Sequence, residues 1–139
     1  MRAVSKSVLA LVLGGMAAGA VTTSALAGTA TAVLDPASPP HYVGKCPGTI
    51  KFNGWISSSV PGVVKYRWFR SDGALGPVQT LVFRQKGRLP ISTTWTLGGI
   101  PALPSYAGWE AVHVLSPAGP DSNKAPFTLK CVQSPLTHG

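Results

Sequence analysis

Apolar and polar residues alternate in short runs over residues 43–132, and no run keeps apolar residues at helical spacing for three turns. The runs are rich in Val, Ile, Thr and aromatic residues, a composition typical of β-strands. The thirteen prolines and sixteen glycines of the chain divide it into short pieces. We therefore predict strands at residues 49–57, 63–70, 78–85, 91–97, 109–115 and 125–131.

The alternation also assigns one apolar face to each strand, and turn signals separate the strands at residues 71–73 and 86–88. At least six strands in about ninety residues predict an all-β fold, either a two-sheet antiparallel sandwich or a small barrel. A parallel sheet would need crossover helices, for which the chain has no room. The predicted apolar faces contain Ile50, Phe52, Ile56, Val64, Tyr66, Trp68, Leu81, Phe83, Ile91, Trp95, Leu97, Ala125, Phe127 and Leu129.

The first 27 residues have the pattern of a secretory signal peptide. Arg2 and Lys6 precede an apolar run at residues 8–20, and residues 25–27 supply the small residues of a cleavage site, which we place after Ala27. A membrane anchor is the alternative, but the run is shorter than the ~20 residues that a spanning helix needs. We expect a secreted product without a transmembrane segment.

The rest of the chain divides into three parts. Residues 28–42 are rich in Ala, Thr and Pro and lack apolar periodicity, so we predict a flexible leader there. The folded domain is expected over residues 43–132, followed by a short polar tail over residues 133–139.

Two cysteines in an exported chain usually pair with each other. Cys46 precedes the first predicted strand and Cys131 ends the last one, each in phase with an apolar face. We predict a Cys46–Cys131 disulfide that joins the two ends of the domain, and the chain-entropy model gives it about 4 kcal/mol of stabilisation. A bridge between two chains would instead place both cysteines out of phase with the apolar faces.

The basic residues suggest a partner class. Without residues 1–27, ten Lys and Arg residues oppose four acidic residues, a formal charge of +6. Such a surface favours polyanions such as nucleic acid, anionic lipid or acidic wall polymers, and it also promotes solubility. If their strands are neighbours, six cations would form one anion-binding patch, and the alternative is a solvated sheet face protected against edge pairing. These candidate anion-binding residues are Lys65, Arg67, Arg70, Arg84, Lys86 and Arg88.

Catalytic residues, metal ligands and cofactors are not predicted. The chain has no G-x-S-x-G motif, no CxxC motif and no Cys/His cluster. Only His113 among the histidines lies in a predicted strand, and no acidic residue has a sequence reason to lie beside it. Asp72 and Asp121 fit turns and Glu110 fits a surface position, so no carboxylate pair for glycoside hydrolysis is expected.

The four tryptophans differ in phase. Trp68, Trp95 and Trp109 are in phase with apolar neighbours, which predicts core positions. Trp55 is out of phase with Ile50 and is predicted to be exposed, where it would suit a carbohydrate contact.

Several segments carry a resemblance to a known family: residues 46–52, 64–74, 95–97, 108–110, 114–117 and 127–131. Over residues 46–131 the chain resembles the small secreted actinobacterial proteins that consist of a single immunoglobulin-like β-sandwich domain. The resemblance implies an antiparallel sandwich of about seven strands with one disulfide. It implies no activity, because the function of that family is largely uncharacterised. Antibody domains join their sheets through cysteines on middle strands, so antibody-like binding loops are not expected here.

Together these observations lead us to expect a secreted, monomeric, non-catalytic binding or structural module. Its expected partner is an unknown protein or a cell-envelope polymer, without specific nucleic-acid binding. Two alternatives remain open: polyanion binding through the Lys and Arg residues, and inhibition of a target protein through the loop at residues 98–106.

Overall fold

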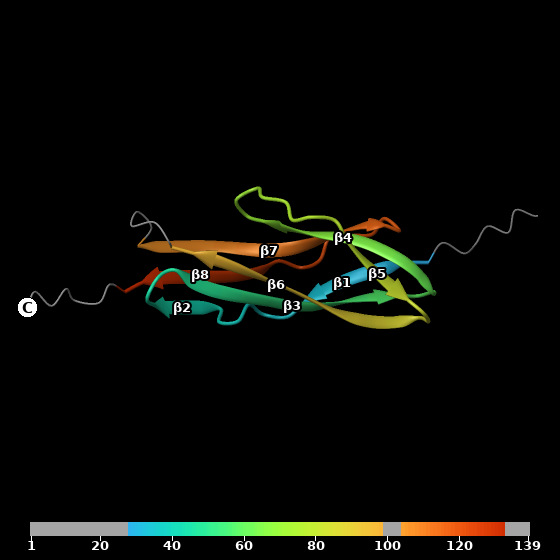
Figure 1. The fold of residues 1–139 in the computed structure, drawn as a ribbon, viewed down its shortest axis with the longest axis horizontal. Coiled ribbons are helices and arrows are strands. Elements are labelled where there is room, and N and C mark those ends of the chain that lie inside the picture. The colour runs from blue at the N-terminus through green and yellow to red at the C-terminus, as the bar shows by residue number, and fades with distance from the viewer. Residues whose placement is uncertain (1–27, 99–103, 133–139) are drawn as a thin grey trace, which may run out of the picture.

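The computed structural model describes residues 28–98 and 104–132 (Figure 1). The predicted signal peptide, the predicted tail and residues 99–103 of the proposed inhibitory loop lie outside the described residues. No helix long and apolar enough to cross a membrane occurs in the part that the structure describes. The strands are β1 (Ala30–Leu34), β2 (His41–Gly44), β3 (Gly48–Ser58), β4 (Gly62–Arg70), β5 (Gln79–Phe83), β6 (Gly87–Leu97), β7 (Ser105–Ser116) and β8 (Ala125–Cys131).

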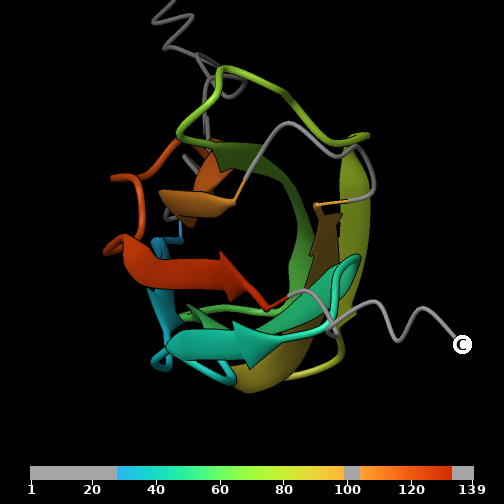
Figure 2. The ribbon, with the colours of Figure 1, turned by 90° about the vertical axis from the view of Figure 1, so that its left-hand side faces the viewer.

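The strands form two sheets with the core between them. Sheet A has the order β1-β3-β6, and sheet B has the order β2-β8-β7-β4-β5. Viewed from the end, the strands surround a common interior (Figure 2). The predicted all-β sandwich is confirmed, with eight strands where about seven were expected.

All six predicted strands are present, and their apolar faces form the core. In β3 every second residue is buried, as the alternation predicts. Each fully buried large apolar side chain contributes about 1.5–3 kcal/mol, so this core is the main source of stability. Its largest fully enclosed side chains are Phe52, Ile50, Ile56, Leu129, Val64 and Val112.

The prediction of a flexible leader over residues 28–42 is wrong, because that segment contains β1 and β2. β1 pairs antiparallel with β3 from Ala30 opposite Ser58 to Leu34 opposite Gly54, and it buries every second residue. A Cβ at position 54 would lie 2.5 Å from the carbonyl oxygen of Val33, so glycine permits this close pairing. Five residues of mostly small side chains give a weak sequence signal, and the pairing with β3 makes them a strand.

β2 corrects the expectation of an entirely antiparallel sandwich. It pairs in parallel with β8, from His41 opposite Thr128 to Gly44 opposite Cys131. Parallel neighbours need a long connection, and here the five strands between β2 and β8 provide it without a crossover helix.

The Cys46–Cys131 disulfide is confirmed. Its Cα atoms are 5.4 Å apart, and the bridge joins cysteines 85 residues apart in the sequence. Both cysteines are half-buried against the core, at the end of the domain where β8 finishes. Gly98 packs against the disulfide. Its φ is +84°, and a Cβ at this position would lie 2.8 Å from the Sγ atom of Cys46.

Candidate functional site

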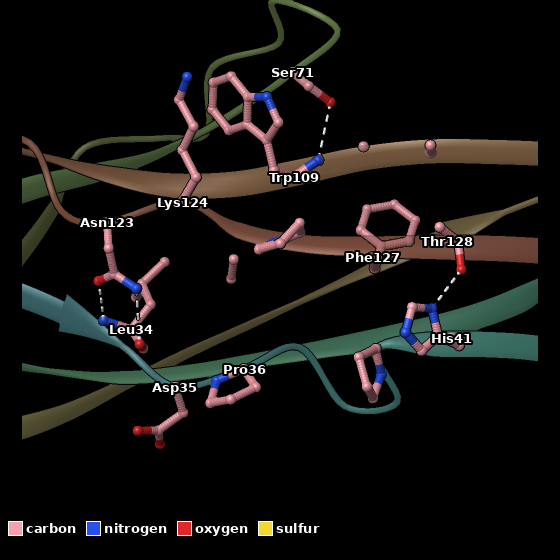
Figure 3. A pocket seen from close by; sticks show the side chains of 15 residues that line it. Leu34, Asp35, Pro36, His41, Ser71, Trp109, Asn123, Lys124, Phe127 and Thr128 are labelled. Carbon is pink, nitrogen blue, oxygen red and sulfur yellow. Dashed lines mark hydrogen bonds between the residues drawn. The ribbon is translucent and has the colours of Figure 1, made fainter.

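An apolar groove of about 670 Å³ lies on the outer side of sheet B, along the beginning of β8 (Figure 3). Its floor is formed by residues 125–128 of β8 and residues 107–109 of β7. One wall is the chain that links β1 to β2, and the other contains Trp109 and Lys124. Pro36, Pro40 and Pro126 line it as well, so much of its surface lacks hydrogen-bond donors.

The groove exists because β8 has no strand beside its first residues on the β2 side. β7 pairs with β8 from Ala125 onward, whereas β2 begins only opposite Thr128. Thr128 donates its backbone N–H to the carbonyl of Pro40, away from β7. Strand alternation directs the carbonyl of Pro126 to the same open side. Because Pro126 has no N–H, this edge offers an acceptor without an unpaired donor.

Side-chain hydrogen bonds fix both ends of the groove. At one end, the Oδ1 atom of Asn123 accepts from the N–H of Leu34 at 2.8 Å, and its Nδ2 atom donates to the Leu34 carbonyl at 3.0 Å. The amide thereby replaces a strand partner and ties β1 to the start of β8. At the other end, the Nδ1 atom of His41 and the hydroxyl of Thr128 are 2.8 Å apart. The groove is therefore preformed, as most ligand pockets are.

Trp109 forms the aromatic rim of the groove and corrects the prediction of a core position. It is half-buried on the outer face of sheet B, since it shares its phase on β7 with His113, while Glu110 points inward. The ammonium of Lys124 lies 4.4 Å from the centroid of the indole ring, and Phe69 packs edge-on at 5.4 Å. Such a cation–π contact contributes about 0.5–1 kcal/mol at an exposed site, enough to favour this ring orientation.

His113 continues this aromatic surface, and the expectation that no acidic residue lies beside it is wrong. Its ring stacks on Phe69 with centroids 3.7 Å apart, and its Nδ1 atom is 2.6 Å from Oδ1 of Asp121. The loop after β7 folds back over the strand, with Ser122 bonded to both backbone groups of Val112. The contact between His113 and Asp121 joins this loop to β7.

Glu110 lies between the sheets, against the expectation of a surface position. Its side chain points inward from β7, and the residue is only 3% exposed. Burial raises the pKa of its carboxyl to about 7; the charge of Arg70 lowers the pKa, and that of Asp72 raises it. Its Oε2 atom is buried without a hydrogen-bond partner in the described structure. The carboxyl is thus part of the core and not part of a pair accessible to substrate.

The six predicted anion-binding residues do not form one patch. Lys65 and Arg67 point outward from sheet B, and the Nε atom of Arg67 donates to the carbonyl of Gly76. Arg70 points inward at the end of β4, where it forms a salt bridge of 2.9 Å with Asp72 and stacks over Trp95.

The other three cations lie elsewhere because β5 and β6 are consecutive strands of different sheets. Arg84 and Lys86 are exposed in the loop that crosses between the sheets. Arg88 lies at the start of β6 on sheet A, with its guanidinium 4.4 Å from the centroid of Trp55. Arg84, Lys86 and Arg88 line one cavity of about 560 Å³ at this crossing. Lys65 and Arg67 lie on the outer face of sheet B, and Arg70 points inward.

No group of three or more His, Cys, Asp or Glu residues that could hold a metal ion occurs among residues 28–98 and 104–132.

Comparison with known proteins establishes the fold. No protein-family model matches the chain, and no curated protein matches its sequence. A similar solved structure is the CARDB domain of the PF1109 protein from Pyrococcus furiosus, crystallised in complex with di-metal ions. The TM-score is 0.53 and the sequence identity 15%, with 77% of this chain and 96% of that chain covered. The immunoglobulin-like sandwich implied by the sequence is thereby confirmed: the protein has the two-sheet fold of a CARDB domain, closed by the Cys46–Cys131 disulfide.

Proposed function

We propose that this protein is an exported, non-catalytic binding module that holds a segment of a partner polypeptide in the groove at β8. The observation that carries the proposal is the preformed apolar groove, in which the open carbonyl of Pro126 lies beside the Trp109 rim. Ligand sites typically combine such an apolar lining with a few fixed polar groups.

The chemistry of the groove favours a polypeptide as its occupant. A peptide supplies N–H donors, which complement an edge that offers an acceptor and no donor. It also supplies an apolar side chain for the space against Trp109. Addition of a complete β-strand is disfavoured, because Pro36 and Pro126 lack the N–H groups that a ladder requires. The peptide is therefore held by one backbone hydrogen bond and one anchoring side chain.

Export is supported by the disulfide, since such bridges persist in oxidising compartments, and by the signal-like sequence of residues 1–27. The immunoglobulin-like fold hosts many functions, so the groove and not the fold carries the argument. The CARDB domain of similar fold was crystallised with di-metal ions.

The test is selection of peptides from a random library on the folded protein, followed by measurement of their Kd by isothermal titration calorimetry. We expect the selected peptides to share one apolar residue, and Trp109→Ala to weaken them about tenfold. N-methylation of the peptide at the residue bonded to Pro126 should weaken binding to a similar degree. Val82→Ala is the matched control, because Val82 is an exposed apolar residue on β5 of the same sheet.

Two outcomes would contradict the proposal. One is that the library yields no binder. The other is that the selected peptides bind wild type and Trp109→Ala with equal affinity, which would place their site outside the groove.

A further inference from the structure

The outer face of sheet A presents side chains in rows that the strand register defines. A central apolar row crosses β1, β3 and β6, a row of polar side chains lies on one side of it, and a row with hydroxyls and a cation lies on the other. These rows are Val33, Trp55 and Pro90 in the centre; Asp35, Asn53 and Ser92 on one side; and Thr31, Ser57 and Arg88 on the other. The face therefore places an apolar strip, with Trp55 at its centre, between two polar strips.

A shallow cup of about 310 Å³ lies between the central row and the first polar row. Trp55 and Pro90 form its apolar side, and Asp35, Asn53 and Ser92 form its polar side. The position of Asp35 is fixed, because its backbone N–H donates to the Asn53 carbonyl at 2.9 Å. A carboxylate, an amide and a hydroxyl thus adjoin an aromatic ring. A sugar ring has the complementary pattern, with apolar C–H faces and hydroxyls around its edge.

Arg88 adds an oriented positive charge to this surface. Its guanidinium lies over the ring of Trp55, 4.4 Å from the ring centroid, and the residue is exposed. None of the ion pairs found among the described residues includes Arg88. A stacked guanidinium keeps its in-plane N–H groups free, in the geometry that binds a carboxylate through two hydrogen bonds. The surface therefore has an anion-binding group without an internal acidic partner.

We infer that the outer face of sheet A binds an acidic glycan, with the hydroxyls of a uronic acid sugar in the cup and a carboxylate of the glycan on Arg88. Lys51 lies two residues before Asn53 on β3, about 7 Å further along the strand, and offers a second cation for a neighbouring acidic sugar. This site is on sheet A and the Trp109 groove is on sheet B; the two share Asp35, whereas Trp55, Pro90 and Arg88 line only the site on sheet A and Trp109 lines only the groove.

Charge density distinguishes a glycan from nucleic acid as the occupant. Lys51 and Arg88 oppose Asp35 on this face, which leaves a net charge of about one. Nucleic-acid binding rests on several simultaneous phosphate contacts, and Asp35 would repel phosphates from the cup. The Ser, Thr and Asn side chains of the face instead match the hydroxyls and sparse charges of a polysaccharide.

The test is calorimetric titration of the folded protein with an oligomer of uronic acid sugars, a neutral glucose oligomer and a thymidine oligonucleotide. We expect the oligouronate to bind most tightly and Arg88→Gln to weaken it about tenfold, the loss typical of a charged hydrogen bond. Lys65→Gln is the matched control, since it removes the same charge from the outer face of sheet B, and it should leave binding within about twofold. Trp55→Ala should abolish binding, with folding checked by its melting curve.

Each contrary result identifies the part that fails. Equal loss in Arg88→Gln and Lys65→Gln would show attraction to the overall charge and overturn the site. Equal binding of the neutral oligomer would overturn the role of Arg88, and tighter binding of the oligonucleotide would overturn the glycan. Absence of binding at millimolar oligouronate would refute the whole inference. Trp109→Ala should leave oligouronate binding unchanged, so this proposal and that of the groove can fail separately.

Discussion

Replacing Glu110 with Gln should remove a pH-dependent loss of stability from the protein. Glu110 is 3% exposed, and burial raises the pKa of its carboxyl from 4.5 to about 7. In the unfolded chain the carboxyl ionises near its ordinary pKa, so between pH 4.5 and about 7 the folded state binds more protons. The free energy of unfolding must therefore fall as the pH rises through this window, and it becomes constant above it.

The pKa difference sets the magnitude. One pKa unit corresponds to about 1.4 kcal/mol, so a rise from 4.5 to about 7 corresponds to about 3 kcal/mol of stability lost across the window. A domain of this size has a total stability of roughly 5–15 kcal/mol, so the loss is readily measurable. Arg70 and Asp72 are the charged residues that act on Glu110, with opposite effects on its pKa. A glutamine at position 110 preserves the shape of the side chain and cannot ionise.

The assay is urea unfolding of the oxidised protein, followed by tryptophan fluorescence, at constant ionic strength from pH 4.5 to 8.5. The difference in the free energy of unfolding between wild type and Glu110→Gln cancels the contributions of the other titrating groups. It should be small at pH 4.5 and reach about 3 kcal/mol in favour of the variant near pH 8. A difference that does not change with pH would refute the reasoning.

Asp72→Asn is the control for this assay. Burial alone would raise the pKa of Asp72, but hydrogen bonds from the Ala74 N–H and Arg70, with the charge of Arg70, lower it below its ordinary value. In the unfolded chain the carboxyl of Asp72 has its ordinary pKa of 3.8. The stabilisation that its ionised form contributes is therefore fully present above pH 3.8, and it is lost only as the pH falls through the lower pKa of the folded state. Because the charge of Asp72 also acts on Glu110, the substitution is made in the Glu110→Gln background, where Asp72→Asn should cause a constant loss over the whole range.

Three further changes test the structure by urea unfolding. Replacing Cys46 and Cys131 with Ala should lower the free energy of unfolding by about 4 kcal/mol, because the bridge closes a long loop; an unchanged value would contradict its role as a stabilising device. Gly98→Ala and Gly73→Ala both place a Cβ at positive φ, which costs about 1–2 kcal/mol, but only Gly98 faces the disulfide sulfurs. Gly98→Ala should therefore cause the larger loss, and equal losses would show that contact with the bridge is unimportant. Asn123→Ala should cost about 2 kcal/mol because it leaves two backbone groups of β1 without partners; a loss below about 0.5 kcal/mol would show that solvent replaces the amide.

The sequence by itself determined the strands of the core and the disulfide. Alternation of period two decides which side chains of a strand share a face, and this geometry holds whatever sheet the strand joins. Ile50, Phe52 and Trp68 could therefore be placed inside from the sequence, and the phase of Cys46 and Cys131 placed their bridge on the core side.

Tertiary structure alone decided which segments meet. β1 has small side chains and a weak pattern, and only the close approach allowed by Gly54 makes it a strand. Lys65 and Arg67 lie on the outer face of sheet B, whereas Arg84, Lys86 and Arg88 gather where the chain crosses from sheet B to sheet A, a division that no local pattern encodes. Glu110 is buried because its neighbours on both sheets exclude water, not because of its residue type. The two candidate sites have the same origin. The Trp109 groove and the outer face of sheet A both depend on strand order and register, which are set by long-range pairing and are not determined by local sequence.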